Sequence, residues 1–345
     1  MALLRTPFKL SIASIASLAV QHKSSIIRIH LLLATFFAVC TSISVHAQDY
    51  PSRPIRIING FPPGGNVDLV GRLIAQKLGE SLKQPVIVES KPGAGTMIAN
   101  DFVAKAPADG YTILLVSGAF PTVAATQRKL PYDPVRDFAW LTTIFTYPLV
   151  AIVRPDSPLR SIDDLIATAK ANPGKLTFPS PGVRSLIHLA GELFCATAGV
   201  EMLHIPYKSS AETVTEVMTG RIDVLFETLT LASTHLQAGK VRALAITSAQ
   251  RVPHMPDLPA VAERLPGFET TSFIGMAAPR GTPGPIVQRL TEEFHKMLAL
   301  PDIRQRFSDL GGTPRPSTPD ETAAFIEKEI VKWRRVVEAR KIAID

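Results

Sequence analysis

A short apolar strand that runs into a loop of prolines and glycines constrains the fold of this chain most strongly. Residues 55–68 read IRIINGFPPGGNVD, and apolar residues then continue at helical spacing. The unit repeats, with an apolar strand at residues 85–89, the loop KPGAGT at residues 91–96, a helix at residues 97–106 and a third strand at residues 112–116. Strands and helices that alternate at this pace predict an α/β fold with a mostly parallel sheet and helices on both faces.

The same alternation resumes in the second half of the chain. After an apolar run at residues 147–153, Ser161 begins a helix, and a strand, a loop and a helix recur at residues 177–198. A proline-rich connection precedes an apolar strand at residues 271–278, which we expect to return to the first lobe. The remaining expected strands are residues 202–205, 221–226 and 241–246, and the last helices are residues 285–300, 302–310 and 320–340.

The chain is long enough for two compact units. It has 345 residues, of which 46% are hydrophobic, and this is ample for two buried cores. We expect lobe 1 to contain residues 48–149 and 276–345, and lobe 2 to contain residues 150–275. Two crossings between two lobes form a hinge, and a hinge creates a cleft.

The first 47 residues have the parts of a secretory signal. They contain four basic residues and no acidic one, then an apolar run at residues 31–39, and Ala47 offers a small residue at a cleavage site. The apolar run is shorter than the roughly 20 residues that span a bilayer. We expect a signal peptide at residues 1–47, cleavage after Ala47 and a periplasmic protein. Cys40 raises the alternative of a lipoprotein, but Phe37 and Val39 are large for a lipid-attachment site.

Removal of this segment changes the charge balance. The whole chain has 37 basic and 30 acidic residues, but without its first 47 residues the net charge is +3. This charge gives no support to nucleic-acid binding. Of the two cysteines only Cys195 then remains, so a disulfide within the chain is excluded. No motif for a dinucleotide, a phosphate-binding loop, a metal site or a catalytic triad is present, so we expect no cofactor, no metal and no catalytic residue.

The first glycine loop has the chemistry of an anion site. Free backbone N–H groups at a helix N-terminus carry about half a positive charge, and glycines let a ligand approach the backbone. Gly64 and Gly65 precede such a helix. The alternative is a tight turn that binds nothing.

Several segments together resemble one protein family. These are IRIINGFPPGGNVDLVGRLIAQKL, ESKPGAGTMIANDFVAKAPADGYTILL, KLPYDPVRDF, HLAGELF, HIPYK, AGKVRALAITS and residues 326–333. In order and spacing they are similar to the Bug family, the extracytoplasmic receptors of tripartite tricarboxylate transporters. The resemblance implies a two-lobed periplasmic-binding-protein fold of type II, a Venus flytrap that closes on a small carboxylate. It also implies delivery of that carboxylate to a membrane permease or to a sensor protein, and we expect a monomer.

The resemblance assigns ligand-binding residues in lobe 1. The family loop P-x-G-G-x-x-D, whose amides and ordered waters hold one carboxylate, is matched at Gly64, Gly65 and Asp68, with Phe61 before it. Phe61 either lines the site or packs in the core, and Asp68 either contacts ligand or caps the helix. A second family loop is matched by residues that include Ala94 and Gly95, and Ser117 at the end of the third strand is placed in the same site. Thr96 replaces a family glycine there and disfavours positive φ, so this loop is expected to be reshaped.

Lobe 2 carries the family pattern S-x-G-x-G-[ST]-x-x-H-L. Ser180, Gly182, Ser185 and His188 match it, while Arg184 replaces its second glycine. The two serines offer hydroxyls to the ligand, and His188 either contacts ligand or is structural. Arg184 either pairs with a second carboxylate, which would favour a dicarboxylate ligand, or forms a surface salt bridge.

Two further residues complete the predicted site. Tyr207 either lines the cleft or braces it, and Glu227 stands where an acid or an amide usually ends a strand in this family. An enzyme that uses Glu227, His188, Lys208 and Asp68 is an alternative, as is a sensor that docks on a kinase. A DNA-binding regulator of the same fold is disfavoured because a secretion signal occupies the place of its helix pair.

Overall fold

The computed structural model describes residues 50–253 and 255–344. The predicted signal peptide and its cleavage after Ala47 lie outside the described residues. In the described part of the chain, no helix is both long enough and apolar enough to cross a membrane.

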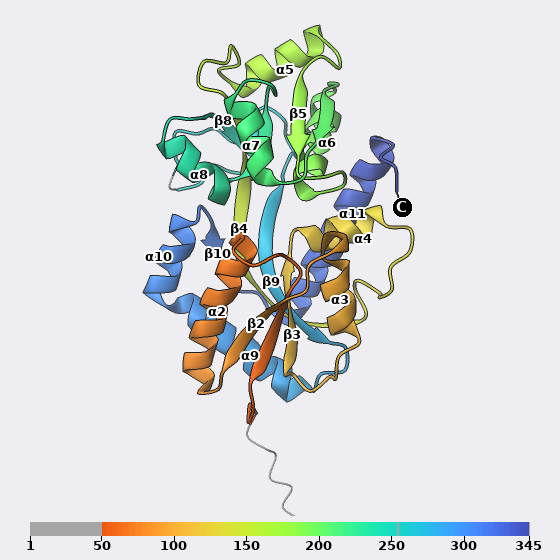
Figure 1. The fold of residues 1–345 in the computed structure, drawn as a ribbon, viewed down its shortest axis with the longest axis vertical. Coiled ribbons are helices and arrows are strands. Elements are labelled where there is room, and N and C mark those ends of the chain that lie inside the picture. Colours follow the sequence, from red (N-terminus) through yellow and green to blue (C-terminus); the bar gives the residue numbers. More distant parts are fainter. Residues whose placement is uncertain (1–49, 254, 345) are drawn as a thin grey trace, which may run out of the picture. The chain divides into compact units, whose positions relative to one another are not determined.

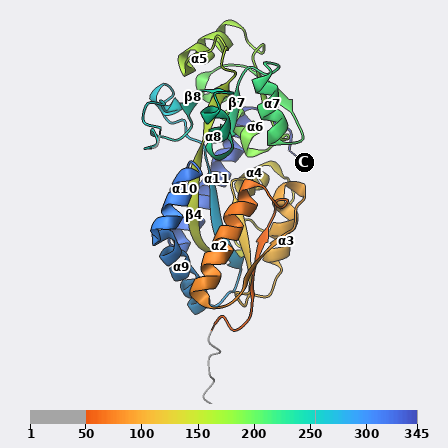
Figure 2. The same cartoon turned by 60° about the vertical axis from the view of Figure 1, so that its left-hand side comes forward.

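The first core is built on the strands predicted from the N-terminal repeats. β1 is parallel to both β2 and β3, and every residue of the central strand β3 is buried. Helices α3, α4 and α11 pack on one side of these strands, while α2 and α9 pack against each other (Figures 1 and 2). The elements are β1 (Ile55–Asn59), α2 (Asn66–Leu82), β2 (Val86–Ser90), α3 (Met97–Ala104), β3 (Thr112–Ser117) and α4 (Ala119–Thr126).

Two strands run through both halves of the molecule. β4 (Phe138–Val153) and β9 (Thr271–Pro279) pair antiparallel to each other, and β9 also pairs antiparallel to β3. The last residues of β4 pair instead with β7 and β8 (Figure 1). The sheet is therefore mixed rather than mostly parallel, because the two crossing strands run in opposite directions. The predicted lobe boundaries fall within these two strands and remain a prediction.

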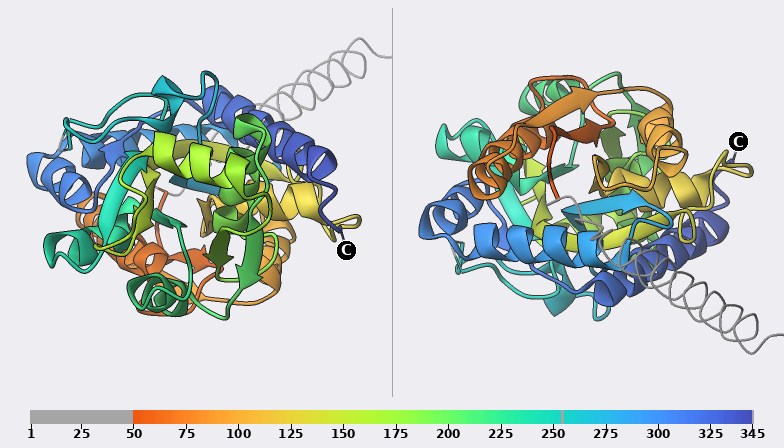
Figure 3. Two further views of the ribbon diagram at one scale, coloured as in Figure 1. Left: turned by 90° about the horizontal axis from the view of Figure 1, so that it is seen from above. Right: turned by 90° about the horizontal axis from the view of Figure 1, so that it is seen from below.

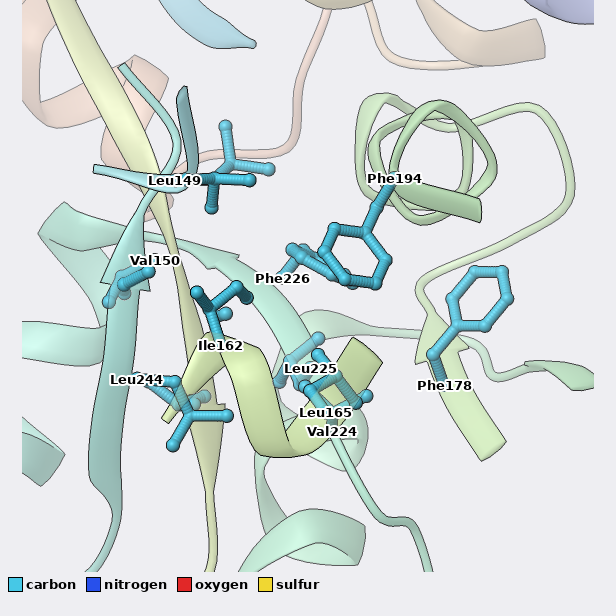
Figure 4. Packing of buried hydrophobic residues seen from close by; sticks show 14 of the residues in the cluster. Leu149, Val150, Ile162, Leu165, Phe178, Phe194, Val224, Leu225, Phe226 and Leu244 are labelled. Carbon is cyan, nitrogen blue, oxygen red and sulfur yellow. The ribbon is translucent and has the colours of Figure 1, made fainter. Parts of the chain in front are cut away.

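The second core is a continuous cluster of buried side chains from residues 149–268. Figure 4 shows Phe194 of α6 beside Phe226 of β7, and their ring centroids are 5.2 Å apart. The side chains of Leu149, Ile162 and Leu165 also belong to this cluster. Its elements are α5 (Ile162–Ala171), β5 (Thr177–Ser180), α6 (Leu186–Ala198), β6 (Leu203–Pro206), α7 (Ser210–Met218), β7 (Leu225–Thr228), α8 (Leu229–Gln237) and β8 (Arg242–Ile246).

The C-terminal helices return to the first core, and the last of them also reaches the second. Trp333, Val336 and Val337 of α11 pack with Leu189 of α6. Arg340 donates to Glu192 of α6 at 2.7 Å and to Glu201 at 2.7 Å. The helices surround the strands when seen from either end (Figure 3). These last elements are α9 (Gly284–Ala299), α10 (Pro301–Asp309), β10 (Thr313–Pro314) and α11 (Pro319–Ala339).

The predicted elements lack the short strand β10 and differ from the observed ones in three longer segments. The sequence does not predict α4, because Pro121 lies within it. It also does not predict the first half of β4, because polar and apolar residues do not alternate there. The strand expected at residues 221–226 lies at Leu225–Thr228 instead, because the preceding residues form the turn after α7. These elements are set by pairing with distant strands, which local patterns do not record.

Candidate functional site

The side chain of Asp68 holds the first glycine loop by hydrogen bonds. The Gly64 N–H donates to Asp68 Oδ2 at 2.9 Å, and Arg72 Nε donates to the same oxygen at 2.8 Å. The Arg72 guanidinium lowers the pKa of Asp68, so this carboxyl group, 1% exposed, is ionised. Asp68 therefore holds the loop and engages the Gly64 amide, while its contact with a ligand stays a prediction.

The start of α2 is exposed and has no capping side chain. Its N-cap is Gly65, which has no capping side chain, and the helical ladder begins with the Leu69 N–H donating to Gly65 O. The three N–H groups before Leu69 therefore lie outside that ladder. Gly64, at φ 85°, and Gly65 are both exposed. Phe61 is half-buried, and its N–H donates to Asn59 Oδ1 at 3.0 Å.

The second glycine loop contains four successive residues with positive φ, beginning with Gly93 at φ 135°. Ala94, Gly95 and Thr96 have φ of 46°, 65° and 91°, so Thr96 adopts the conformation that its branched side chain disfavours. Thr96 is buried against Gly60, and its hydroxyl accepts from Asn100 Nδ2 at 3.2 Å. The tertiary contacts hold the backbone in this form in spite of the threonine.

Ser117 and Ser180 are both buried. Ser117 Oγ accepts from the Ala119 N–H at 3.3 Å at the start of α4. Ser180 Oγ donates to Gly182 O at 2.7 Å and lies 2.7 Å from His204 Nε2. Gly182 has φ 133° and is half-buried. In this structure the Ser180 hydroxyl therefore fixes the turn.

The start of α6 is organised by its own side chains. Ser185 is the N-cap, and its hydroxyl accepts from the His188 N–H at 3.3 Å. His188 Nδ1 accepts from the Arg184 N–H at 2.9 Å, and the His188 ring stacks on His204 with a centroid distance of 3.8 Å. His188 therefore has structural partners on both sides, and its contact with a ligand stays a prediction. Burial and the neighbouring His188 lower the pKa of His204 to about 4, so His204 is neutral.

Arg184 adopts a glycine-like conformation at φ 70°. Its Nη1 lies 3.5 Å from the carbonyl oxygen of Ala343, near the C-terminus. A contact of this length is weak, and the pairing of Arg184 with a ligand carboxylate stays a prediction.

Tyr207 and Glu227 differ in their surroundings. The Tyr207 hydroxyl donates to Glu216 at 3.3 Å within lobe 2, which is the bracing alternative. Glu227 is 1% exposed, and burial raises its pKa to about 7. Its Oε2 is buried with no hydrogen-bond partner among the described residues.

The described residues contain no group of three or more histidines, cysteines or acids that could hold a metal ion. A groove of about 860 Å³ is lined by residues that include Phe102 and Lys129. It shares no residue with the predicted site, and we place no part of the carboxylate site there.

Comparison with known proteins is decisive for the family. Residues 70–342 match the tripartite tricarboxylate transporter family receptor model, named TctC. The chain belongs to the TctC receptor family. BugT of Bordetella pertussis is 37% identical over 85% of this chain and 91% of the relative. A UPF0065 protein from the tcbD–tcbE intergenic region of Pseudomonas sp. (strain P51) is 39% identical, over 89% and 93%.

Solved structures agree with this TctC-family assignment. R. palustris Rpa4515, solved with adipate, superimposes with a TM-score of 0.78 at 34% identity, over 86% of this chain and 99% of that one. MatC of Rhodopseudomonas palustris, solved with malate, gives 0.73 at 30% identity, over 84% and 100%. The two-lobed α/β fold expected from the sequence is thereby confirmed.

Sequence reasoning missed Tyr147, a buried residue of this TctC-family protein that lies near residues of both predicted lobes. Tyr147 of β4 is 3% exposed, and burial raises the pKa of its hydroxyl. Hydrogen bonds with the Ser272 and Asn66 side chains lower this pKa, and the charge of Glu227 raises it further. Tyr147 thus lies near groups from α2, from the crossing strand β9 and from β7 of lobe 2. A tyrosine and an adjacent Pro148 inside an otherwise apolar run were the available signal.

Proposed function

We propose that the protein is a non-enzymatic extracytoplasmic receptor that captures a small carboxylate, and in particular a dicarboxylate, between its two lobes. The observation that carries this proposal is the exposed N-terminus of α2, where Gly65 leaves the first helical N–H groups without a capping side chain. A carboxylate at such a position gains charge-assisted hydrogen bonds of roughly 1.5 to 3 kcal/mol each. Relatives solved with adipate and malate support this ligand class.

The proposed site joins both lobes around Tyr147. Lobe 1 supplies the α2 loop and the second glycine loop, with Phe61, Gly64, Gly65, Ala94 and Gly95. The other proposed residues are Asp68, Ser117, Ser180, Gly182, Arg184, Ser185, His188, Tyr207 and Glu227, of which several act by holding the loops. The proposed partners are the membrane permease subunits of a tripartite tricarboxylate transporter, and the proposed location is the periplasm, where BugD is described as a binding protein.

Thermal-shift measurements with adipate, malate and monocarboxylates test the proposal. A ligand that binds only the native state raises the melting temperature by mass action. Gly65→Asp adds a favourable N-cap to α2 but puts a negative charge where the ligand carboxylate binds. We expect this variant to keep its own stability and to lose the adipate- or malate-induced shift.

The matched control makes the same change at another helix start. Gly284→Asp lies at the exposed first turn of α9, with nothing within 4 Å of an added Cβ. The Gly284→Asp variant is expected to keep the rise in melting temperature that adipate or malate induces. An unreduced rise in melting temperature in Gly65→Asp would reject the α2 site. Chemical conversion of adipate on long incubation would reject the receptor function in favour of an enzyme.

A further inference from the structure

Glu227 has two unlike carboxyl oxygens. Oε1 accepts from the Thr228 N–H at 2.7 Å and from the Thr228 hydroxyl at 3.0 Å. Oε2 is buried and accepts no direct hydrogen bond from the described residues, while the nearby side chain of Ser210 opposes the rise in the pKa of Glu227 only weakly compared with burial. An ionised oxygen in that state is costly, because burial removes its water and no direct hydrogen bond at Oε2 replaces it. A proton on Oε2 would remove the charge and turn that oxygen into a donor.

Within residues 50–253 and 255–344, no cation is among the groups that shift the pKa of Glu227. Strand β7 packs against β4, β5, α6, α7 and α8. The titratable side chains on these elements engage elsewhere or lie at a distance: Glu192 binds Arg340, Glu216 binds Arg221, and Glu212 accepts from the Lys208 N–H. His188, Cys195 and His235 complete the set on the helices, and none of these groups affects the pKa of Glu227. The groups that lower the pKa of Glu227 are the uncharged hydrogen-bond donors of Thr228 and Ser210, and Glu227 in turn raises the pKa of Tyr147.

The position of Glu227 connects it to the proposed carboxylate site. Tyr147, with which it interacts, also lies near the side chain of Asn66 at the first turn of α2. Glu227 itself stands directly before α8, whose N-cap Thr228 provides no capping side chain. The buried carboxyl group therefore lies on the lobe 2 side of the same centre.

We propose that Glu227 is protonated when the receptor holds a dicarboxylate, and that its Oε2–H donates to the ligand carboxylate that faces lobe 2. Binding then takes up one proton from solvent, which resides on Glu227 and forms a carboxylic acid–carboxylate pair. This inference rests on the proposed function, since it concerns the same site and assigns the second acidic group of the ligand.

Two physical arguments support the pair. Two ionised carboxylates cannot share a site without water, so an incoming anion raises the proton affinity of its neighbour. In the pair, the Oε2–H of the protonated Glu227 donates to a carboxylate oxygen of the ligand, so both groups are hydrogen-bonded. An ionised Glu227 would instead repel the ligand. The burial that already raises the pKa of Glu227 acts in the same direction.

Isothermal titration of the full protein with adipate at about pH 8, in buffers of different ionisation enthalpy, counts the protons. We expect uptake of about one proton for each adipate bound, and an affinity that falls about tenfold for each pH unit above the pKa. Glu227→Gln keeps the shape and supplies a permanent donor, so it should bind adipate without proton uptake and without this pH dependence. Monomethyl adipate, which lacks the second carboxylate, should bind without uptake to both proteins.

Glu269→Gln is the matched control, since it removes the charge of an exposed glutamate in the same lobe. It should retain the proton uptake of the unmodified protein. Adipate binding without proton uptake, or equal uptake by Glu227→Gln, would overturn the inference and leave the receptor function standing. If neither adipate nor malate raises the melting temperature of the unmodified protein or of Glu227→Gln, the proposed function fails and the inference fails with it.

Discussion

At the scale of single residues, burial determines the behaviour of Glu227. The pKa of its carboxyl group is 4.5 in the absence of the fold and is raised to about 7 by burial. Below pH 4.5 both the folded and the unfolded states are protonated, so the group adds nothing. As pH rises from 4.5 to 7 the unfolded state loses its proton first, and the folded protein loses about 3 kcal/mol of stability from this group.

Glu227→Gln should remove this loss. The difference in the free energy of unfolding between the variant and the unmodified protein should grow by about 3 kcal/mol from acid to neutral pH. Urea titrations at several pH values measure it. The lowered pKa of His204 acts in the opposite direction, since its contribution is lost as pH falls below 6.5, but it is common to both proteins and cancels. Parallel pH profiles would contradict the assignment.

Arg184 belongs to the same scale, because its prediction concerns one guanidinium. Arg184→Gly removes a donor to the second carboxylate and also relieves a left-handed backbone at φ 70°. We expect the affinity for adipate to fall by about tenfold and that for monomethyl adipate to change little. Titration calorimetry with both ligands decides this. Equal losses, or none, would assign Arg184 to its contact with Ala343.

At the scale of elements, the two glycine loops of lobe 1 support each other. A Cβ added at Gly60 would lie 2.7 Å from Thr96 Cβ, so Gly60 leaves room for the threonine of the second loop. Thr96 holds φ 91° although it is β-branched, and this packing is what stabilises it. The absence of a side chain at one loop thus permits the strained conformation of the other.

A double-mutant cycle tests this coupling. Gly60→Ala should destabilise the protein by about 1 to 3 kcal/mol through overpacking. Gly60→Ala combined with Thr96→Gly should lose much less than the sum, since the clashing side chain is gone. Thermal and urea unfolding measure both effects. Gly284→Ala, with open space around its Cβ, is the control and should be near neutral; additive losses in the cycle would reject the coupling.

At the scale of the whole molecule, β4 and β9 connect two separate cores, and α11 contacts both. A ligand that touches both lobes only in the closed state shifts the molecule toward that state. Trp333 packs with α6, and Arg340 binds Glu192 of α6 and Glu201. These contacts form a third connection between the cores, and closure of the lobes must either preserve them or break them.

Small-angle scattering measures the closure. Saturating adipate or malate should reduce the radius of gyration of the unmodified protein, because the ligand favours the closed state. Gly65→Asp at the same ligand concentration should show no reduction, which separates closure from an effect of the salt. Bound ligand with an unchanged radius would contradict the hinge mechanism.

The sequence by itself determined the two-lobed class and most of the order of the elements, and it predicted an anion site at the start of α2. These follow from local features: the spacing of apolar residues, the glycines of residues 60–65 and the helix that begins directly after them. The resemblance to a receptor family rested on the same short segments, and the family match confirmed it.

Only the tertiary structure decided which polar groups are satisfied and which are not. Ser180 meets His204 and Tyr147 lies near Asn66 and Glu227 because strands distant in sequence are brought together. The same long-range pairing made the sheet mixed and buried Glu227 Oε2 away from any direct hydrogen bond in the described part of the chain. Burial is a property of the whole fold, so the proton that we assign to Glu227 could not be inferred from the residues around it in sequence.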